Sequence, residues 1–124
     1  MNTQDKQATG QWGETLAAEY LQKEGFVILH RNWRCPPWEL DLVARRGDVL
    51  HIVEVKSRRR GALTTPEEAM TPAKCRALYR AACRYVAKYR WEGDTQFDLI
   101  AVEFDEGGGT YALRYIPQVF TPHW

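Results

Sequence analysis

The stretch of sequence that decides the fold is ELDLVARRGDVLHIVEVK, residues 39–56. Its two halves, Glu39–Arg45 and Val49–Lys56, are rich in residues that favour β-strands, and Arg46-Gly47-Asp48 joins them. A Gly-Asp pair suits a two-residue turn, so the stretch predicts a β-hairpin whose residues pair in regular order outward from the turn.

In this register two acidic side chains oppose each other. Asp41 lies opposite Glu54 and Glu39 lies opposite Lys56, and the alternation of side chains along a strand puts all four on one face. Opposed Cβ atoms are about 5 Å apart, so the carboxylates of Asp41 and Glu54 repel unless one is protonated or a cation lies between them. Mg²⁺ prefers one or two carboxylates completed by waters and phosphate oxygens, and Lys56 could orient a water or neutralise charge on the phosphate.

The alternative is that these charges have no special role. Two opposed acids can be surface neighbours, and Glu39 with Lys56 can form an ordinary cross-strand ion pair. However, the strand that carries Glu54 is apolar on both faces between Leu50 and Val55, which is typical of a central, covered strand. Unpaired charges are costly there, so the pattern favours a site.

The rest of the chain predicts a helix on either side of this hairpin and further strands. The expected elements are a helix at Gly13–Glu24, strands at Phe26–Trp33, Glu39–Arg45 and Val49–Lys56, a helix at Thr71–Tyr89, and strands at Gln96–Phe104 and Tyr111–Ile116. This order, α-β-β-β-α-β-β, predicts an α/β fold in which helices cover a mixed sheet. We expect residues 1–124 to form a single domain, with residues 1–9 as a flexible tail and a mobile loop from Ser57 through Pro66.

Composition and length exclude several classes of protein. The chain has 124 residues, of which 44% are hydrophobic and 27% charged, as expected for one globular domain. No apolar run approaches the ~20 residues that cross a bilayer, and residues 1–10 are polar, so we expect a cytoplasmic protein without a membrane partner. Cys35, Cys75 and Cys83 lack metal-site spacing, which favours reduced core thiols over disulfides or zinc.

Two further polar residues lie on predicted strands. His51 should point away from the Glu54 face because side chains alternate along the strand. Asp98 could be a further acid of the site, or an exposed strand acid without a role.

The charge distribution is uneven although the net charge is only +1. Residues 45–90 hold twelve Lys and Arg against four Asp and Glu. On the long helix, cations recur at every fourth residue with no acid between Met70 and Arg90, and these are Arg76, Arg80, Arg84 and Lys88. A solvated helix face is the alternative, but such faces usually interleave acids. We therefore expect this stripe, and more strongly the run Arg58, Arg59 and Arg60 beside Lys56, to contact nucleic-acid phosphates.

The spacing of the acidic residues resembles a known superfamily. Glu14, Glu39-Leu40-Asp41-Leu42 and Glu54-Val55-Lys56 resemble the signature of restriction-endonuclease-like nucleases, which include Holliday-junction resolvases. More closely, the chain resembles the YraN family of small nuclease-like proteins over most of its length. The matching motifs are Gly10-x-x-Gly13-Glu14, Ala17-Ala18, Tyr20-Leu21, Gly25-Phe26, Asn32-Trp33-Arg34 and Val53-Glu54-Val55-Lys56-x-Arg58. Trp38 departs from the pattern, since the family usually has glycine before Glu39.

The resemblance implies a restriction-endonuclease-like fold and a role for each matching residue. Asp41 and Glu54 would ligate Mg²⁺ or Mn²⁺ together with the Val55 carbonyl, and Lys56 would position or activate the attacking water. Glu14 would be a further, outer ligand; without the resemblance it is an acid favoured in the first turn of a helix by the helix dipole.

These observations predict a metal-dependent nuclease that hydrolyses phosphodiesters of nucleic acid, with DNA as the expected substrate. The alternative function is a nucleic-acid-binding or adaptor protein that keeps the nuclease fold without useful cleavage. Symmetric cleavage of a four-way junction would require two active sites and hence a homodimer, and the sequence alone does not decide whether the protein forms one.

Overall fold

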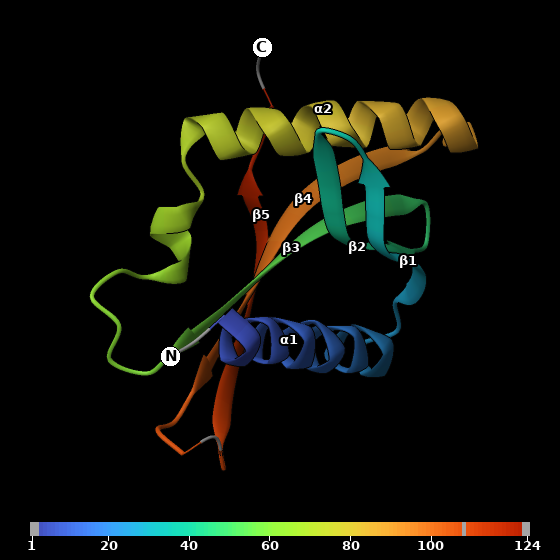
Figure 1. The fold of residues 1–124 in the computed structure, drawn as a ribbon. Helices are drawn as coiled ribbons and strands as arrows, with labels where there is room; N and C mark the ends of the chain where they lie inside the picture. Colours follow the sequence, from blue (N-terminus) through green and yellow to red (C-terminus); the bar gives the residue numbers. More distant parts are fainter. Residues whose placement is uncertain (1–2, 108, 123–124) are drawn as a thin grey trace.

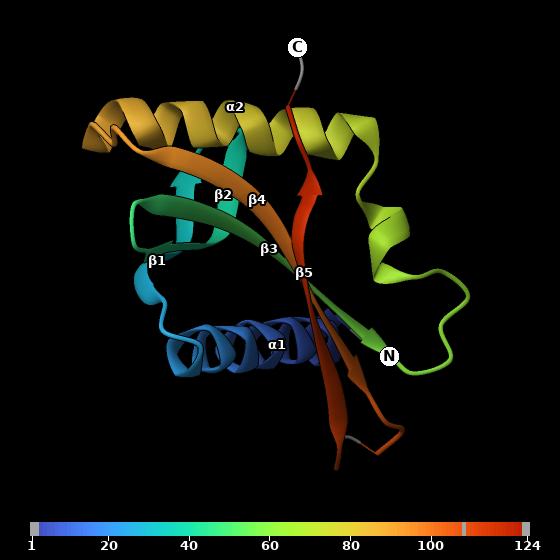
Figure 2. The same cartoon turned by 180° about the vertical axis from the view of Figure 1, so that it is seen from behind.

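A five-stranded mixed sheet runs through the middle of the molecule, with one helix on each face (Figures 1 and 2). The computed structural model describes residues 3–107 and 109–122. Its elements are α1 (Thr3–Lys23), β1 (Val27–Cys35), β2 (Trp38–Arg46), β3 (Val49–Arg59), the short 3-10 helix η1 (Pro66–Ala69), α2 (Pro72–Tyr89), β4 (Asp94–Phe104) and β5 (Tyr111–Phe120). The α/β class and the order α-β-β-β-α-β-β are therefore confirmed, in the arrangement expected for a restriction-endonuclease-like fold.

The strands lie in the order β1-β2-β3-β4-β5, and only β3 and β4 are parallel. A parallel pair needs a long crossover connection, which α2 supplies. Helix α1 covers one face of the sheet, where Leu21 packs with Val53 and Val102. Helix α2 covers the other face, where Leu78 packs with Leu40 and Ile52. Strand β3 is therefore buried on both faces, as its apolar run predicted.

The hairpin register is confirmed near the turn. Strands β2 and β3 pair from Arg46↔Val49 to Leu42↔Val53, and Gly47 in the turn has φ 60°, which a glycine adopts without strain. Glu39 pairs with Arg34 of β1, and the two side chains form an exposed ion pair at 3.8 Å. The predicted pairing of Glu39 with Lys56 is therefore wrong, because β2 parts from β3 beyond Leu42.

Several element boundaries differ from the predicted ones. Helix α1 begins at Thr3 rather than Gly13, so it already includes part of the predicted tail at 1–9, while residues 1–2 lie outside the described residues. Strand β3 continues to Arg59 because Ser57, Arg58 and Arg59 pair with β4, so the loop starts later than the expected Ser57. Pairing with a distant strand extended the element beyond what local sequence indicated.

Two expectations from composition can be compared with the described residues. No helix within residues 3–107 and 109–122 is long and apolar enough to cross a membrane. All three cysteines are free, and Cys75 is buried in the core, whereas Cys83 is exposed on α2. The expectation of core thiols therefore holds for Cys75 and fails for Cys83.

Helix α1 approaches β3 closely at Gly13. A Cβ atom on Gly13 would overlap Ser57 Oγ and would lie 3.2 Å from Ser57 Cβ. Only a residue without a side chain lets α1 lie this close to the end of β3, where the residues of the predicted site are found.

We predict that Gly13→Ala lowers the free energy of unfolding by about 1–3 kcal/mol, because the added methyl group overpacks the contact with Ser57. Gly10→Ala is the matched control: Gly10 lies on the same helix, and nothing is found within 4 Å of the place that its Cβ would take. Helix propensity should therefore leave Gly10→Ala neutral or up to about 1 kcal/mol more stable. Urea unfolding followed by circular dichroism measures both. Equal stability of the two variants would contradict the close approach, and Ser57→Ala should partly rescue Gly13→Ala.

Candidate active site

A pocket of about 670 Å³ opens where β2 parts from β3. It lies between α1, the C-terminal half of β3 and the first turn of α2. Its lining residues are Gly10, Glu14, Asp41, Glu54, Val55, Lys56, Ser57, Arg58, Arg59, Ala62 and Lys74. The structure therefore brings together every residue for which a catalytic or metal-binding role was predicted, along with two of the three arginines that follow Lys56.

Asp41 lies at the point where the two strands separate. Its Oδ2 accepts a hydrogen bond from the backbone N–H of Val55, at 2.9 Å. In a regular continuation of the ladder, Val55 would pair with the backbone of Leu40. A side-chain carboxylate thus replaces a backbone partner, which fixes Asp41 beside β3 and opens the sheet for the pocket.

Glu54 is the most buried acid of the pocket, with 4% of its surface exposed. Burial raises its pKa to about 8, and a hydrogen bond with Asp41 and the charge of Asp41 act in the same direction. Two ammonium groups oppose this rise: Lys74 Nζ lies 3.2 Å from Oε2, and Lys56 Nζ lies 4.0 Å from Oε1. The Glu54 carboxyl is therefore held between a second acid and two lysines.

Glu14 reaches the same pocket from α1. Burial raises its pKa, and the charge of Asp41 raises it further, whereas a hydrogen bond with Asn32 and the charge of Arg31 lower it. Asn32 has φ 51°, a left-handed conformation that asparagine adopts more readily than most residues. An irregular residue of β1 thus helps to hold the acid of α1.

The donor set fits a hard divalent cation in an open site. Asp41 and Glu54 share a hydrogen bond while two lysines partly neutralise Glu54, and Val55 lines the same wall. Within the described part of the chain, no three His, Cys, Asp or Glu side chains are grouped so as to hold a metal ion. Two carboxylates and a backbone carbonyl, completed by water and phosphate, suit Mg²⁺ better than a closed cage does. The role of Glu14 as an outer ligand stays a prediction.

Lys74 is the pocket residue that the sequence reasoning missed. It lies in the first turn of α2, where Thr71 caps the helix by accepting the Lys74 N–H at 3.2 Å. A cation in this position opposes the helix dipole, since the N-terminal end of a helix favours acids. That local disadvantage was the available signal, because it suggests that Lys74 is present for another partner, which the structure identifies as Glu54.

The arginines after Lys56 divide into two groups. Arg58 and Arg59 line the pocket, and Arg58 Nη1 donates to Thr64 Oγ1 at 2.8 Å. Arg60 instead pairs with Asp105 at 2.7 Å. The buried Arg58 Nε and Ser57 Oγ have no hydrogen-bond partner among the described residues, although buried polar atoms usually have one. Both atoms are thus buried beside the pocket without a protein partner in the part of the chain that the structure describes.

The cationic stripe on α2 lies outside the pocket. All four of its members are exposed, on the side of α2 opposite the buried Leu78, Ala81 and Tyr85. Arg84 lies over the ring of Trp38 at 5.4 Å, and Lys88 lies over the ring of Tyr89 at 5.7 Å. The stripe, Arg76, Arg80, Arg84 and Lys88, is thus available to a partner, and its contact with nucleic acid stays a prediction.

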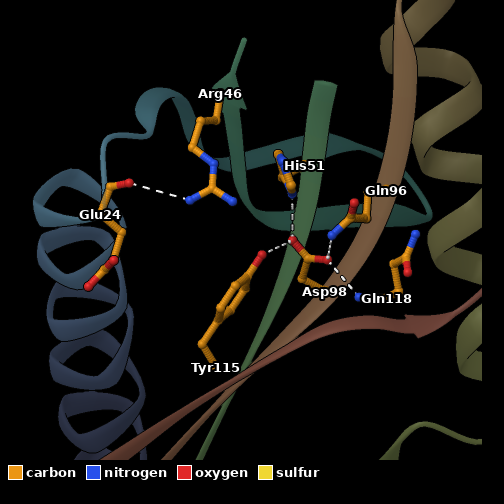
Figure 3. Close-up of polar contacts among 7 residues, drawn as sticks. All are labelled: Glu24, Arg46, His51, Gln96, Asp98, Tyr115 and Gln118. Carbon is orange, nitrogen blue, oxygen red and sulfur yellow. Dashed lines mark hydrogen bonds and ion pairs between the residues drawn. The ribbon is translucent and has the colours of Figure 1, made fainter. Parts of the chain in front are cut away.

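Asp98 belongs to a second polar cluster, shown in Figure 3. Its Oδ2 accepts from Tyr115 Oη and contacts His51 Nδ1, both at 2.7 Å, and its Oδ1 accepts from Gln96 Nε2 at 2.9 Å and the Gln118 N–H at 3.0 Å. Burial alone would raise the pKa of Asp98, but these hydrogen bonds outweigh it and hold the pKa below its ordinary value.

Both alternatives for Asp98 are therefore wrong. The residue is 1% exposed, and it does not line the pocket that holds Asp41 and Glu54. Its cluster joins β3, β4 and β5, with His51 packed edge-on against Phe26 on the α1 side of the sheet. His51 does point away from Glu54, as predicted from the alternation along β3.

Comparison with known proteins finds a family match over most of the chain. The model of the uncharacterised protein family UPF0102 matches residues 13–102, a range that includes every acid and lysine of the pocket. A UPF0102 protein of Nitratidesulfovibrio vulgaris is 40% identical over 116 residues, or 93% of this chain and 85% of that protein. One of Streptomyces coelicolor is 44% identical over 104 residues, or 82% and 80%. One of Nocardioides sp. is 53% identical over 81 residues, which cover 65% of each chain and so less than two thirds of that protein.

We predict that metal-free protein loses stability between about pH 4.5 and pH 8 because of Glu54. The pKa of Glu54 is raised in the folded state, so in this range the folded protein binds more protons than the unfolded chain, and stability falls as the pH rises. The slope from this group reaches at most about 1.4 kcal/mol per pH unit. Thermal unfolding in EDTA should show this slope in the wild type, and Glu54→Gln should remove it. Parallel curves for the two proteins would contradict the raised pKa.

Proposed function

The chain belongs to the uncharacterised protein family UPF0102, the YraN family, and we propose that it is a metal-dependent nuclease that hydrolyses phosphodiester bonds of DNA. The observation that carries the proposal is the pocket in which buried Glu54 and Asp41 share a hydrogen bond beside Lys56 and Lys74. Such a pairing of acids and lysines is what hydrolysis of a phosphodiester needs: ligands for a cation, and positive charge for the phosphate. The proposal keeps the cytoplasmic location expected from the sequence.

Asp41, Glu54 and the carbonyl of Val55 would hold Mg²⁺ or Mn²⁺, with Glu14 as an outer ligand. The bound ion would supply Lewis-acid stabilisation of the phosphate and lower the pKa of a coordinated water. The backbone N–H of Val55 fixes Asp41, so a rigid strand rather than a loop positions this carboxylate.

The lysines and arginines of the pocket would act on the substrate. Lys56, whose Nζ lies 4.0 Å from Glu54 Oε1, would donate a hydrogen bond to the attacking water or to a phosphate oxygen. Lys74 would neutralise Glu54 and face the phosphate from the opposite element, α2. Arg58 and Arg59 would bind neighbouring phosphates along the same wall.

The second candidate is an adaptor that binds nucleic acid without cleaving it. The 3.2 Å ion pair between Lys74 and Glu54 favours the adaptor, because the lysine can neutralise the carboxylate in place of a metal ion. The two candidates differ in whether a divalent ion binds at Asp41 and Glu54. If the substrate is a four-way junction, the nuclease would further have to act as a homodimer.

We predict that cleavage of labelled branched and linear DNAs requires Mg²⁺ or Mn²⁺ and falls to background in Asp41→Asn and in Glu54→Gln. Each change removes charge from the ligand set with little change in size. Glu39→Gln is the matched control, since this acid lies on the same strand but pairs with Arg34 at the surface.

A readout without catalysis accompanies this assay. Mg²⁺ should raise the melting temperature of the wild type and of Glu39→Gln, but not of Asp41→Asn, because only binding to the folded state stabilises it. Full cleavage by both site variants, with contaminating nuclease excluded, would refute the site. An unchanged melting temperature of the wild type in Mg²⁺, together with no cleavage of any DNA, would favour the adaptor.

We predict that replacing Arg76, Arg80 and Arg84 by glutamine weakens DNA binding for all sequences alike, because phosphate contacts carry no base identity. The slope of log K against log salt should fall in magnitude by roughly two to three, at about 0.7–0.9 per lost contact. Arg34, Arg45 and Arg90 are also exposed and lie off the stripe, so their replacement is the matched control. An equal change of slope in both triple variants would indicate that the stripe is an ordinary solvated helix face without specific phosphate contacts.

A further inference from the structure

Three depressions on the surface adjoin one another. The pocket of Glu54 shares Lys74 with a depression of about 240 Å³ under the tip of the β1–β2 hairpin. That depression shares Trp38 with a third, of about 490 Å³, which Arg80 and Arg84 of α2 also line. Because neighbouring depressions share a lining residue, we refer to the three together as the track, from the carboxylates of the pocket to the outer face of α2.

Trp38 occupies the middle of this track. It is the first residue of β2, paired with Cys35 at the hairpin tip, and Figure 1 shows this tip against α2. The indole is half-buried, and the Arg84 guanidinium lies 5.4 Å from the centre of its ring. An arginine at this distance makes a cation–π contact, and Trp38 lines both outer depressions.

The charge along the track suits a polyanion. From Lys74 to Arg84 it follows ten residues of α2, or about 15 Å of helix. Lys74, Arg80 and Arg84 contribute positive charge along this length. Glu39 is the one acid that lines the two outer depressions within the described residues, and its partner is Arg34, at 3.8 Å.

We propose that this track binds an unpaired stretch of the substrate strand, with a base against Trp38 and phosphates on Arg80 and Arg84. In a duplex the faces of the bases are covered by their neighbours, so a tryptophan beside a row of cations can stack only on a base that is unpaired. The proposal takes the identity of the ligand, nucleic acid, from the proposed function. It makes the substrate class DNA with a single-stranded segment next to the bond that is cut.

The test compares two fluorescent DNAs in EDTA: a blunt duplex, and the same duplex with an unpaired arm. Trp38→Leu keeps an apolar side chain but no ring, and should weaken binding of the armed DNA roughly five- to hundredfold, as expected for the loss of one stacked base. Binding of the blunt duplex should stay within about twofold, and Trp38→Phe should retain most of the preference for the arm. Fluorescence anisotropy measures each affinity, after circular dichroism has established that the variants are folded.

Matched controls separate the track from general effects. Trp12 is also partly exposed but packs on Phe104 at 4.7 Å, away from the track, so Trp12→Leu should leave the preference for the arm unchanged. Arg84→Gln should weaken binding of the armed DNA more than Arg45→Gln does. An equal loss of both DNAs in Trp38→Leu, or no loss of either, would overturn the proposal.

The same DNAs incubated with Mg²⁺ distinguish this failure from a failure of the nuclease assignment. If the wild type cleaves DNA and Trp38→Leu does not change the preference for the arm, the track proposal is refuted and the nuclease proposal stands. If Trp38→Leu selectively loses binding of the armed DNA but the wild type cleaves no DNA, the track proposal stands and the nuclease proposal is refuted.

Discussion

The buried carboxyl of Glu54 is the constraint on which the surrounding structure depends. A charged carboxylate at 4% exposure is costly unless it has partners, and here they come from different elements. Lys56 of the same strand and Lys74 of α2 lower the pKa of Glu54, whereas Asp41 of β2 raises it. The position of α2 on the sheet is therefore coupled to the protonation of Glu54. Because the close approach at Gly13 brings α1 to the same place, the pocket is held by both helices and two strands.

Glu54 and Asp98 show that the partners of a buried acid decide the direction in which its pKa shifts. Both are buried on adjacent strands, yet the pKa of Glu54 is raised and that of Asp98 is lowered. Asp98 receives donors from Tyr115, Gln96 and the Gln118 backbone, and contacts His51, so its charge is satisfied within the protein. Glu54 has lysines at 3.2 and 4.0 Å and a second acid against it. Its charge is thus only partly satisfied, and a cation would complete what the protein leaves open.

The sequence predicted those features that follow from local order. The turn at Gly47 and Asp48 sets the pairing of β2 with β3, and this placed Asp41 near Glu54 without any knowledge of the rest of the fold. Lys74 could not be placed in this way, because its contact depends on how a helix farther along the chain packs on the sheet. For the same reason Asp98 was misjudged: apart from Gln96, its partners lie on β3 and β5, and periodicity along β4 does not reveal them. Local patterns therefore located the acids, whereas their counter-charges depend on tertiary packing.

The separation of acids from cations explains how a chain of net charge +1 could attract a polyanion to a carboxylate site. Carboxylates alone repel phosphate, so an approaching strand needs positive charge on the way in and beside the reacting bond. In the proposed nuclease, Arg58 and Arg59 at the end of β3 would supply it on one side of the pocket, and Lys74 would begin a second row on α2. Arg60 would not contribute, because it pairs with Asp105. The local field at the pocket is thus set by the few cations that line it, and the overall charge of the protein carries little information about it.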